Sequence, residues 1–279
     1  MQNVQASAQP LFLDLHAGAL GRRFAVYHAP RPSLMQGQVV YLHPFAEEMN
    51  KSRRMAALQS RALARAGFAV LQMDLLGSGD SDGDFGDASW ERWVDDAVFG
   101  VRWLAKRAAG PLWLWGLRAG CLLATEVAHR LDQPSRFLFW QPASSGKLLL
   151  RQFLRTKIAA DMPVGKSHGL MTNLRDRLSS GQSLDIAGYT LSPAMALGLE
   201  QATLRSPLRS SQSIWYELSL RPDDGPTAGL TANSSRWADA GSPPIVCTVE
   251  GPAFWQTSEI KDAPTLIDAT VSAVTEMAT

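Results

Sequence analysis

Residues 112–121, which read LWLWGLRAGC, decide the fold of this chain. The first four are large and apolar, which is typical of a buried β-strand, and residues 122–128 favour a helix. Gly116 and Gly120 frame the turn between the two and permit a tight, strained backbone. The stretch therefore predicts a strand, a sharp turn and a helix, with the side chain of Arg118 projecting from the tip of the turn.

The composition is that of an ordinary globular protein. The chain has 279 residues, of which 46% are hydrophobic and 19% charged, and its formal net charge is +1. This length allows one large α/β domain or two small ones. A nearly neutral chain gives no electrostatic basis for binding nucleic acid.

Cysteine content and the N-terminal residues indicate the compartment. Cys121 and Cys247 are too far apart for a short metal-binding motif, and two thiols in a chain of this size are typical of a reducing environment. The first fifteen residues lack the basic region and the apolar core of a signal peptide. No stretch approaches the roughly 18 apolar residues of a membrane span. We therefore expect a cytoplasmic protein with no metal or cofactor and no transmembrane segment.

Short apolar runs alternate with longer helical ones along most of the chain. We expect strands at 23–28, 38–42, 69–73, 112–115, 136–140, 213–220 and 245–249, and helices at 55–65, 90–106, 122–131, 234–240 and from 264. This order predicts an α/β fold, with a mostly parallel central sheet flanked by helices.

The pattern changes at about residue 144. Residues 147–162 form an amphipathic helical pattern, and a weakly periodic Gly/Ser-rich region follows to about 211. An insertion after a central strand commonly covers the ligand-binding edge of such a sheet. We therefore expect a core of residues 1–143 and 212–279 and a helical cap at 144–211. A membrane-surface role for the helix at 147–162 stays open, although its few basic residues favour the cap.

Four segments, in this order, resemble the α/β-hydrolase superfamily. They are YLHPF at 41–45, DLLGSGDSDG at 74–83, GLRAG at 116–120 and QPAS at 141–144. The resemblance implies an α/β-hydrolase fold in which the first segment is the oxyanion-hole loop. It also implies that GLRAG is the nucleophile elbow, for which the superfamily pattern is G-x-S-x-G.

A narrower resemblance rests on two segments, LHPFAEEMNKSRR at 42–54 and WGLRAG at 115–120. Together they resemble the second of the two exosortase A system-associated hydrolases. That family occurs in bacteria that sort proteins to the cell surface and make exopolysaccharide. The resemblance implies a setting in that system, with a protein partner from it.

The catalytic residues that the superfamily uses are incomplete. Arg118 stands at the nucleophile position, and a guanidinium that stays protonated cannot attack a carbonyl. The histidine expected after the last strand is missing from residues 249–258, VEGPAFWQTS, and the last histidine of the chain is His168. The resemblance places the acid at Asp223 or Asp224. We therefore expect Ser-His-Asp hydrolysis to be lost.

Other parts of the site survive. The resemblance places oxyanion-hole donors at the backbone amides of Phe45 and Ala119, which need no particular side chain. A cation at a helix N-terminus needs a negative partner. Arg118 therefore either forms a salt bridge with Glu47 or Glu48, or binds an anionic group of a ligand.

Two function classes follow. In the first, the protein is a pseudoenzyme that binds an anionic or carbonyl-bearing small molecule, or a protein partner, in the former active site. In the second, it is an active hydrolase, esterase or acyltransferase with unusual residues. The nucleophile is then a water, a serine or a cysteine such as Cys121, and the base is His43 or His168, although buried cysteines and loop-anchoring histidines are the commoner cases.

Overall fold

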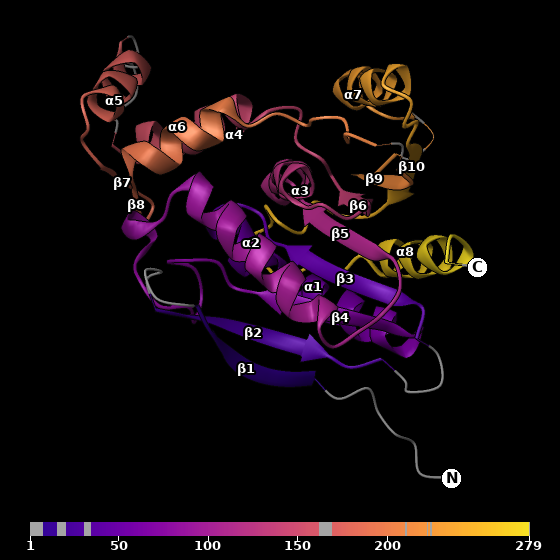
Figure 1. The fold of residues 1–279 in the computed structure, drawn as a ribbon. Helices are drawn as coiled ribbons and strands as arrows, with labels where there is room; N and C mark the ends of the chain where they lie inside the picture. Colours follow the sequence, from indigo (N-terminus) through magenta and orange to yellow (C-terminus); the bar gives the residue numbers. More distant parts are fainter. Residues whose placement is uncertain are drawn as a thin grey trace.

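The computed structural model describes residues 8–15, 21–30, 35–161, 169–209, 211–221, 223 and 225–278. An eight-stranded sheet forms its centre (Figure 1), with the strands in the spatial order β1-β2-β4-β3-β5-β6-β9-β10. In chain order the strands are β1 (Ala8–Asp14), β2 (Arg22–His28), β3 (Gly37–Leu42), β4 (Phe68–Met73), β5 (Leu112–Leu117), β6 (Ser135–Trp140), β9 (Ser213–Ser219) and β10 (Ile245–Glu250).

The six strands from β4 to β10 are parallel, and β1 and β2 form an antiparallel edge. Every residue of β3 and of β5 is buried, which is the reason that their sequences are almost continuously apolar. The predicted fold class, a mostly parallel sheet flanked by helices, is confirmed.

Helices cover both faces of the sheet. The helices α1 (Glu47–Arg65) and α8 (Pro264–Glu276) pack on one face, together with Trp113 and Trp115 of β5. On the other face lie α2 (Trp90–Ala105), α3 (Ala119–Arg130) and α7 (Ala228–Asp239), as Figure 1 shows. The described helices include none with the length and apolar composition that crossing a bilayer requires.

Several elements differ from the expected bounds. Helix α1 begins at Glu47 and not at residue 55, because its first two turns are too polar to show an apolar periodicity. Helices α3 and α7 also begin earlier than expected. The strand β1 was not predicted, since it pairs only with β2 at the sheet edge and most of its residues are exposed.

The segment between β6 and β9 holds α4 (Gly146–Asp161), α5 (Leu170–Ser179), a hairpin of β7 (Leu184–Ile186) and β8 (Tyr189–Leu191), and α6 (Pro193–Gln201). Figure 1 shows these elements grouped together on one side of the central sheet. The hairpin turns through Ala187 and Gly188, both with positive φ, which is the geometry of a two-residue turn between twisted strands. The sequence showed only α4 here, because the other elements are short.

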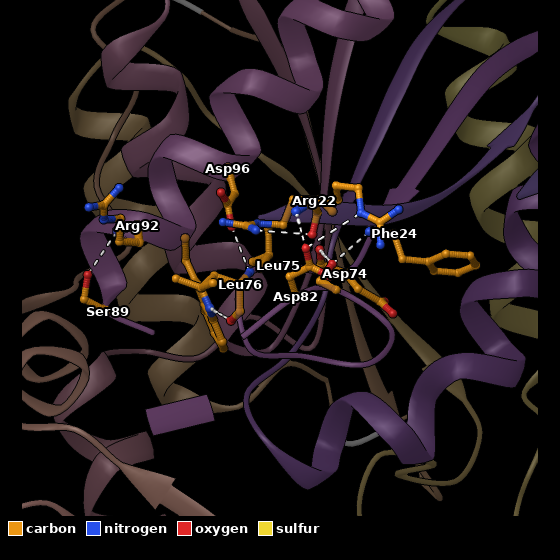
Figure 2. Close-up of polar contacts among 12 residues, drawn as sticks. Arg22, Phe24, Asp74, Leu75, Leu76, Asp82, Ser89, Arg92 and Asp96 are labelled. Atoms are coloured by element: carbon orange, nitrogen blue, oxygen red, sulfur yellow. Dashed lines mark hydrogen bonds and ion pairs between the residues drawn. The ribbon is translucent and has the colours of Figure 1, made fainter. Parts of the chain in front are cut away.

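The segment DLLGSGDSDG forms a turn that ties the end of β4 to β2 (Figure 2). The Asp82 carboxylate accepts a hydrogen bond from the Arg22 N–H at 2.7 Å, and the Ser81 hydroxyl accepts one from Phe24 N–H at 2.9 Å. Ser81 also donates to the Asp74 carbonyl at 2.5 Å. The turn therefore has a structural role and fixes the end of β4 beside the loop that follows β3.

A buried ion pair lies beside this turn. Arg23 Nε and Asp96 Oδ2 are 2.7 Å apart, with side chains only 1% and 5% exposed. The same carboxylate oxygen accepts a hydrogen bond from the Leu76 N–H at 2.8 Å (Figure 2). Burial raises the pKa of Asp96, and the adjacent Arg23 opposes that rise. Asp96 thus connects α2, β2 and the turn after β4 through one carboxylate.

Candidate functional site

The turn between β5 and α3 has the predicted sharp geometry. Arg118 adopts φ 56° and ψ −112°, a sparsely populated conformation that costs about 1–3 kcal/mol. The two glycines are required by close contacts, since a Cβ at Gly116 would lie 2.5 Å from Cys121 N. A Cβ at Gly120 would lie 2.0 Å from the Leu42 carbonyl oxygen. The start of α3 therefore packs directly on the backbone at the end of β3.

Arg118 connects three parts of the chain. Its Nε lies 3.3 Å from Glu48 Oε1 on α1, and its Nη2 donates to Gln152 Oε1 on α4 at 3.1 Å. The guanidinium carbon is 5.8 Å from the ring centroid of Trp255, in the loop after β10. Of the two expected acidic partners, Glu48 pairs with Arg118. Glu47 is more exposed and pairs instead with Lys51, at 3.2 Å.

Glu48 lies in an unfavourable environment for a carboxylate. Burial raises its pKa, although the neighbouring Arg118 opposes that rise. Its second oxygen, Oε2, is buried and has no hydrogen-bond partner among the described residues. An acceptor left in this state costs about 1–3 kcal/mol. The ion pair with Arg118 is therefore only partly satisfied.

This environment predicts a pH-dependent contribution to stability. In the folded protein Glu48 holds a proton at pH values where an unfolded Glu has released it, so its contribution falls as pH rises above about 4.3. We expect the unfolding free energy of the wild type relative to Glu48→Gln to decrease from pH 5 to pH 8, measured by urea titration. Glu47→Gln removes a charge from the same helical turn and is the control. A difference that increases with pH would show that the attraction of Arg118 outweighs burial.

The backbone amides of Phe45 and Ala119 lie on segments that contact each other. The loop carrying Phe45 follows β3, whose last carbonyl packs against Gly120. The Ala119 N–H is in the first turn of α3, where helical N–H groups have no acceptor within the helix. In the part of the chain that the structure describes, neither N–H has a hydrogen-bond acceptor. Two free donors at this place can bind a carbonyl oxygen or an anion.

His43 anchors the same loop. Its Nδ1 donates to the Pro44 carbonyl at 2.8 Å, and its Nε2 accepts from the Leu75 N–H at 3.4 Å. The side chain is buried, which lowers its pKa. Both ring nitrogens are therefore engaged in a neutral imidazole, and neither has a free lone pair for proton abstraction.

Of the other catalytic candidates, Cys121 is inaccessible as a nucleophile. Cys121 is fully buried, its Sγ lies 3.7 Å from the Trp140 carbonyl, and burial raises its pKa well above the ordinary value. Asp223 lies exposed in the loop after β9. Asp224 and His168 fall outside the described residues.

Trp255 stands in the loop where the superfamily histidine was expected. The side chain is only 3% exposed, and its Nε1 has no hydrogen-bond partner among the described residues. Trp255 was not among the site residues expected from the sequence. The only available signal was its place in the segment after the last strand, because a tryptophan is not a catalytic residue type.

A cavity of about 310 Å³ lies between the loop after β3, the start of α1, α4 and the loop after β10. Its lining is Phe45, Ala46, Glu47, Glu48, Lys51, Leu149, Gln152, Phe153, Thr156, Ala187, Trp255 and Gln256. Arg118 contacts three of these residues, as described above. No histidine of the described ranges is in this lining, and those ranges contain no group of three potential metal ligands.

The strand order, the covering helices and the glycine-framed turn between β5 and α3 define an α/β-hydrolase fold. The sequence profile of a family within this fold, described as serine aminopeptidase, S33, matches residues 34–209. The chain belongs to this family.

Similar proteins support the fold. The human protein ABHD12B is 34% identical over 96 residues, which are 34% of this chain and 25% of that protein. The matched region is thus a quarter of that relative's length. Est1E from Butyrivibrio proteoclasticus, in a structure with ferulic acid, has a TM-score of 0.62 and 16% identity, covering 96% of this chain and 97% of that one. Mouse α/β-hydrolase domain-containing protein 10 has a TM-score of 0.57 and 14% identity, with coverage of 97% and 98%.

Proposed function

We propose that this α/β-hydrolase-fold protein is a binding protein that does not carry out Ser-His hydrolysis. The proposal rests on the identity of the residue at the elbow tip. Arg118 is there, paired with Glu48, and Trp255, whose ring centroid is 5.8 Å from the guanidinium carbon, stands in the loop where the histidine was expected. Among the described residues, neither a nucleophile nor a general base is then available at the tip.

The proposed ligand carries a carbonyl or an anionic group on an apolar body. The Phe45 and Ala119 amides supply donors for an oxygen atom, and Arg118 adds a cation beside them. Phe153 and Trp255 give the cavity apolar walls. In this proposal residues 144–211 form the cap, because α4 contributes one wall of the cavity, and residues 1–143 and 212–279 form the core.

The biological setting is also a proposal. The segments that resemble the exosortase A system-associated hydrolases support a cytoplasmic role in exopolysaccharide production or surface-protein sorting. A binding protein of this fold would there carry a small molecule, or contact a protein partner of the system through its cap.

The competing proposal is an active hydrolase or acyltransferase with unusual catalytic residues. Membership of the serine aminopeptidase family favours it, and so do the two amides that lack an acceptor. It requires a nucleophile and a base from outside the expected positions.

Reactivity separates the two proposals. We expect no labelling of the wild type by a fluorophosphonate probe and no turnover of p-nitrophenyl esters above the rate in buffer, because the described residues place no activated nucleophile at the elbow. Arg118→Ser supplies a hydroxyl without a base and should also be inert. A catalytically active serine hydrolase of the same fold is the positive control. Stoichiometric labelling of the wild type would favour the enzyme.

Binding is tested with a variant that fills the cavity. Thr156 is exposed and lines the cavity, so Thr156→Trp should abolish thermal shifts caused by small carbonyl compounds. Arg155→Trp places the same side chain at the neighbouring exposed position outside the lining and is the matched control. Equal shifts in both variants would place the binding site elsewhere.

A further inference from the structure

The last strand of the central sheet has an open edge. On one side β10 pairs with β9, and no strand of the described chain pairs with its other side (Figure 1). Ile245, at the start of the strand, is 51% exposed, and the next three residues are half-buried. A strand in this position presents a row of unpaired backbone groups, which can pair with a strand of another chain.

Alternate residues of β10 direct their backbone groups to the open side. The Gly251 N–H donates to the Ser219 carbonyl of β9 at 3.2 Å, so in this parallel ladder residues 245, 247, 249 and 251 face β9. Val246, Thr248 and Glu250 therefore direct their N–H and C=O groups outward. None of these three N–H groups has a backbone acceptor among the described residues.

The two edges of the sheet differ in how they are protected against such pairing. The strand β1, at the opposite edge, contains Pro10, which has no N–H to offer to another strand. The strand β10 reads IVCTVE, with neither proline nor lysine and with its one charge at the last residue, Glu250. The composition of β10 is therefore that of a strand that can accept a further strand.

We infer that two copies of this chain pair through β10, antiparallel and with Thr248 opposite Thr248 of the second copy. In this register Val246 lies opposite Glu250, and the exposed Ile245 lies opposite Gly251. Each pair of outward-facing residues exchanges two hydrogen bonds, so every outward N–H of the strand finds an acceptor. Thr–Thr pairs are favourable across strands, and the register places no like charges opposite each other.

The sequence before β10 favours this register and a second copy as the partner. A register with Cys247 opposite Cys247 would place Pro244 opposite Glu250, and a hydrogen bond would be lost there because proline has no N–H. The register with Thr248 at its centre uses all three outward-facing residues of each chain. The edge is thus complementary to itself, as a two-fold symmetric contact requires.

Analytical ultracentrifugation of the full chain at several concentrations tests the inference. A contact built on six residues of one strand is small beside the roughly 1,200–2,000 Å² of a stable interface, so we expect a dimer that dissociates on dilution. Thr248→Lys places two like charges opposite each other and should raise the dissociation constant at least about 10-fold. Pro10→Lys puts the same charge on the exposed β1 edge and should leave the dimer unchanged.

A second pair of variants reports on the register and on folding. Thr248→Pro removes an N–H that has no backbone acceptor among the described residues, so it should keep the circular dichroism of the wild type and lose the dimer. Cys247→Ser/Thr248→Cys should form an intermolecular disulfide on oxidation, since Cα atoms of a hydrogen-bonded pair are about 5.5 Å apart.

Three outcomes would overturn the inference. The first is a wild type that is monomeric at every concentration. The second is a dimer that Pro10→Lys weakens while folded Thr248→Lys and Thr248→Pro keep it, which would place the contact at β1. The third is a wild-type dimer that cross-links through Cys247, which would show the other register.

Discussion

Replacing Asp96 by alanine is expected to lower the free energy of unfolding by about 3–5 kcal/mol, because it removes the carboxylate that lies 2.7 Å from Nε of the buried Arg23 guanidinium. The change also removes the acceptor for the Leu76 N–H, which holds the turn after β4 (Figure 2). Urea unfolding monitored by tryptophan fluorescence measures the loss. A decrease of this size is a large fraction of the 5–15 kcal/mol by which domains are stable.

The neighbouring residue provides the matched control. Asp95 is on the same helix but 57% exposed, and it pairs with Arg130 at 2.8 Å. Asp95→Ala should therefore cost only about 0–1 kcal/mol. The double variant Arg23→Leu/Asp96→Leu should recover much of the loss, since an apolar pair leaves no buried charge. If Asp95→Ala and Asp96→Ala lowered the free energy of unfolding equally, burial of the Arg23–Asp96 pair would not explain the effect.

Gly120→Ala is expected to destabilise the protein by about 1–3 kcal/mol or more, and to displace the loop that carries Phe45. The added Cβ would lie 2.0 Å from the Leu42 carbonyl and 3.0 Å from the His43 carbonyl, and both are backbone atoms that cannot rotate away. Urea titration measures the stability. The same variant should bind carbonyl compounds more weakly, because the amides of Phe45 and Ala119 would separate.

Gly100→Ala is the control for this substitution. Gly100 is also helical, but an added Cβ would meet mainly the flexible end of Met73, at 3.1 Å. Since alanine favours helices by about 1 kcal/mol over glycine, little net change or a small gain is expected. A Gly120→Ala variant as stable as Gly100→Ala would show that the elbow is not tightly packed against the end of β3.

The sequence alone determined the fold class and the nature of the elbow. Apolar runs bounded by glycine and polar turns predicted the strands, because a parallel strand buried on both faces must be continuously apolar. The segment GLRAG predicted the sharp turn with Arg118 at its tip, since these requirements are local to a few residues. The same reasoning missed β1 and the start of α1, where few side chains are buried.

Only the tertiary structure decided the contacts of the site. The sequence could not show whether Glu47 or Glu48 pairs with Arg118, because the pairing depends on which face of α1 contacts the elbow. It could not place Trp255 in the cavity wall or Gln152 beside the guanidinium. These residues are far apart in the chain, and they come together only because parallel strands end at one edge of the sheet, where the following loops and α4 meet.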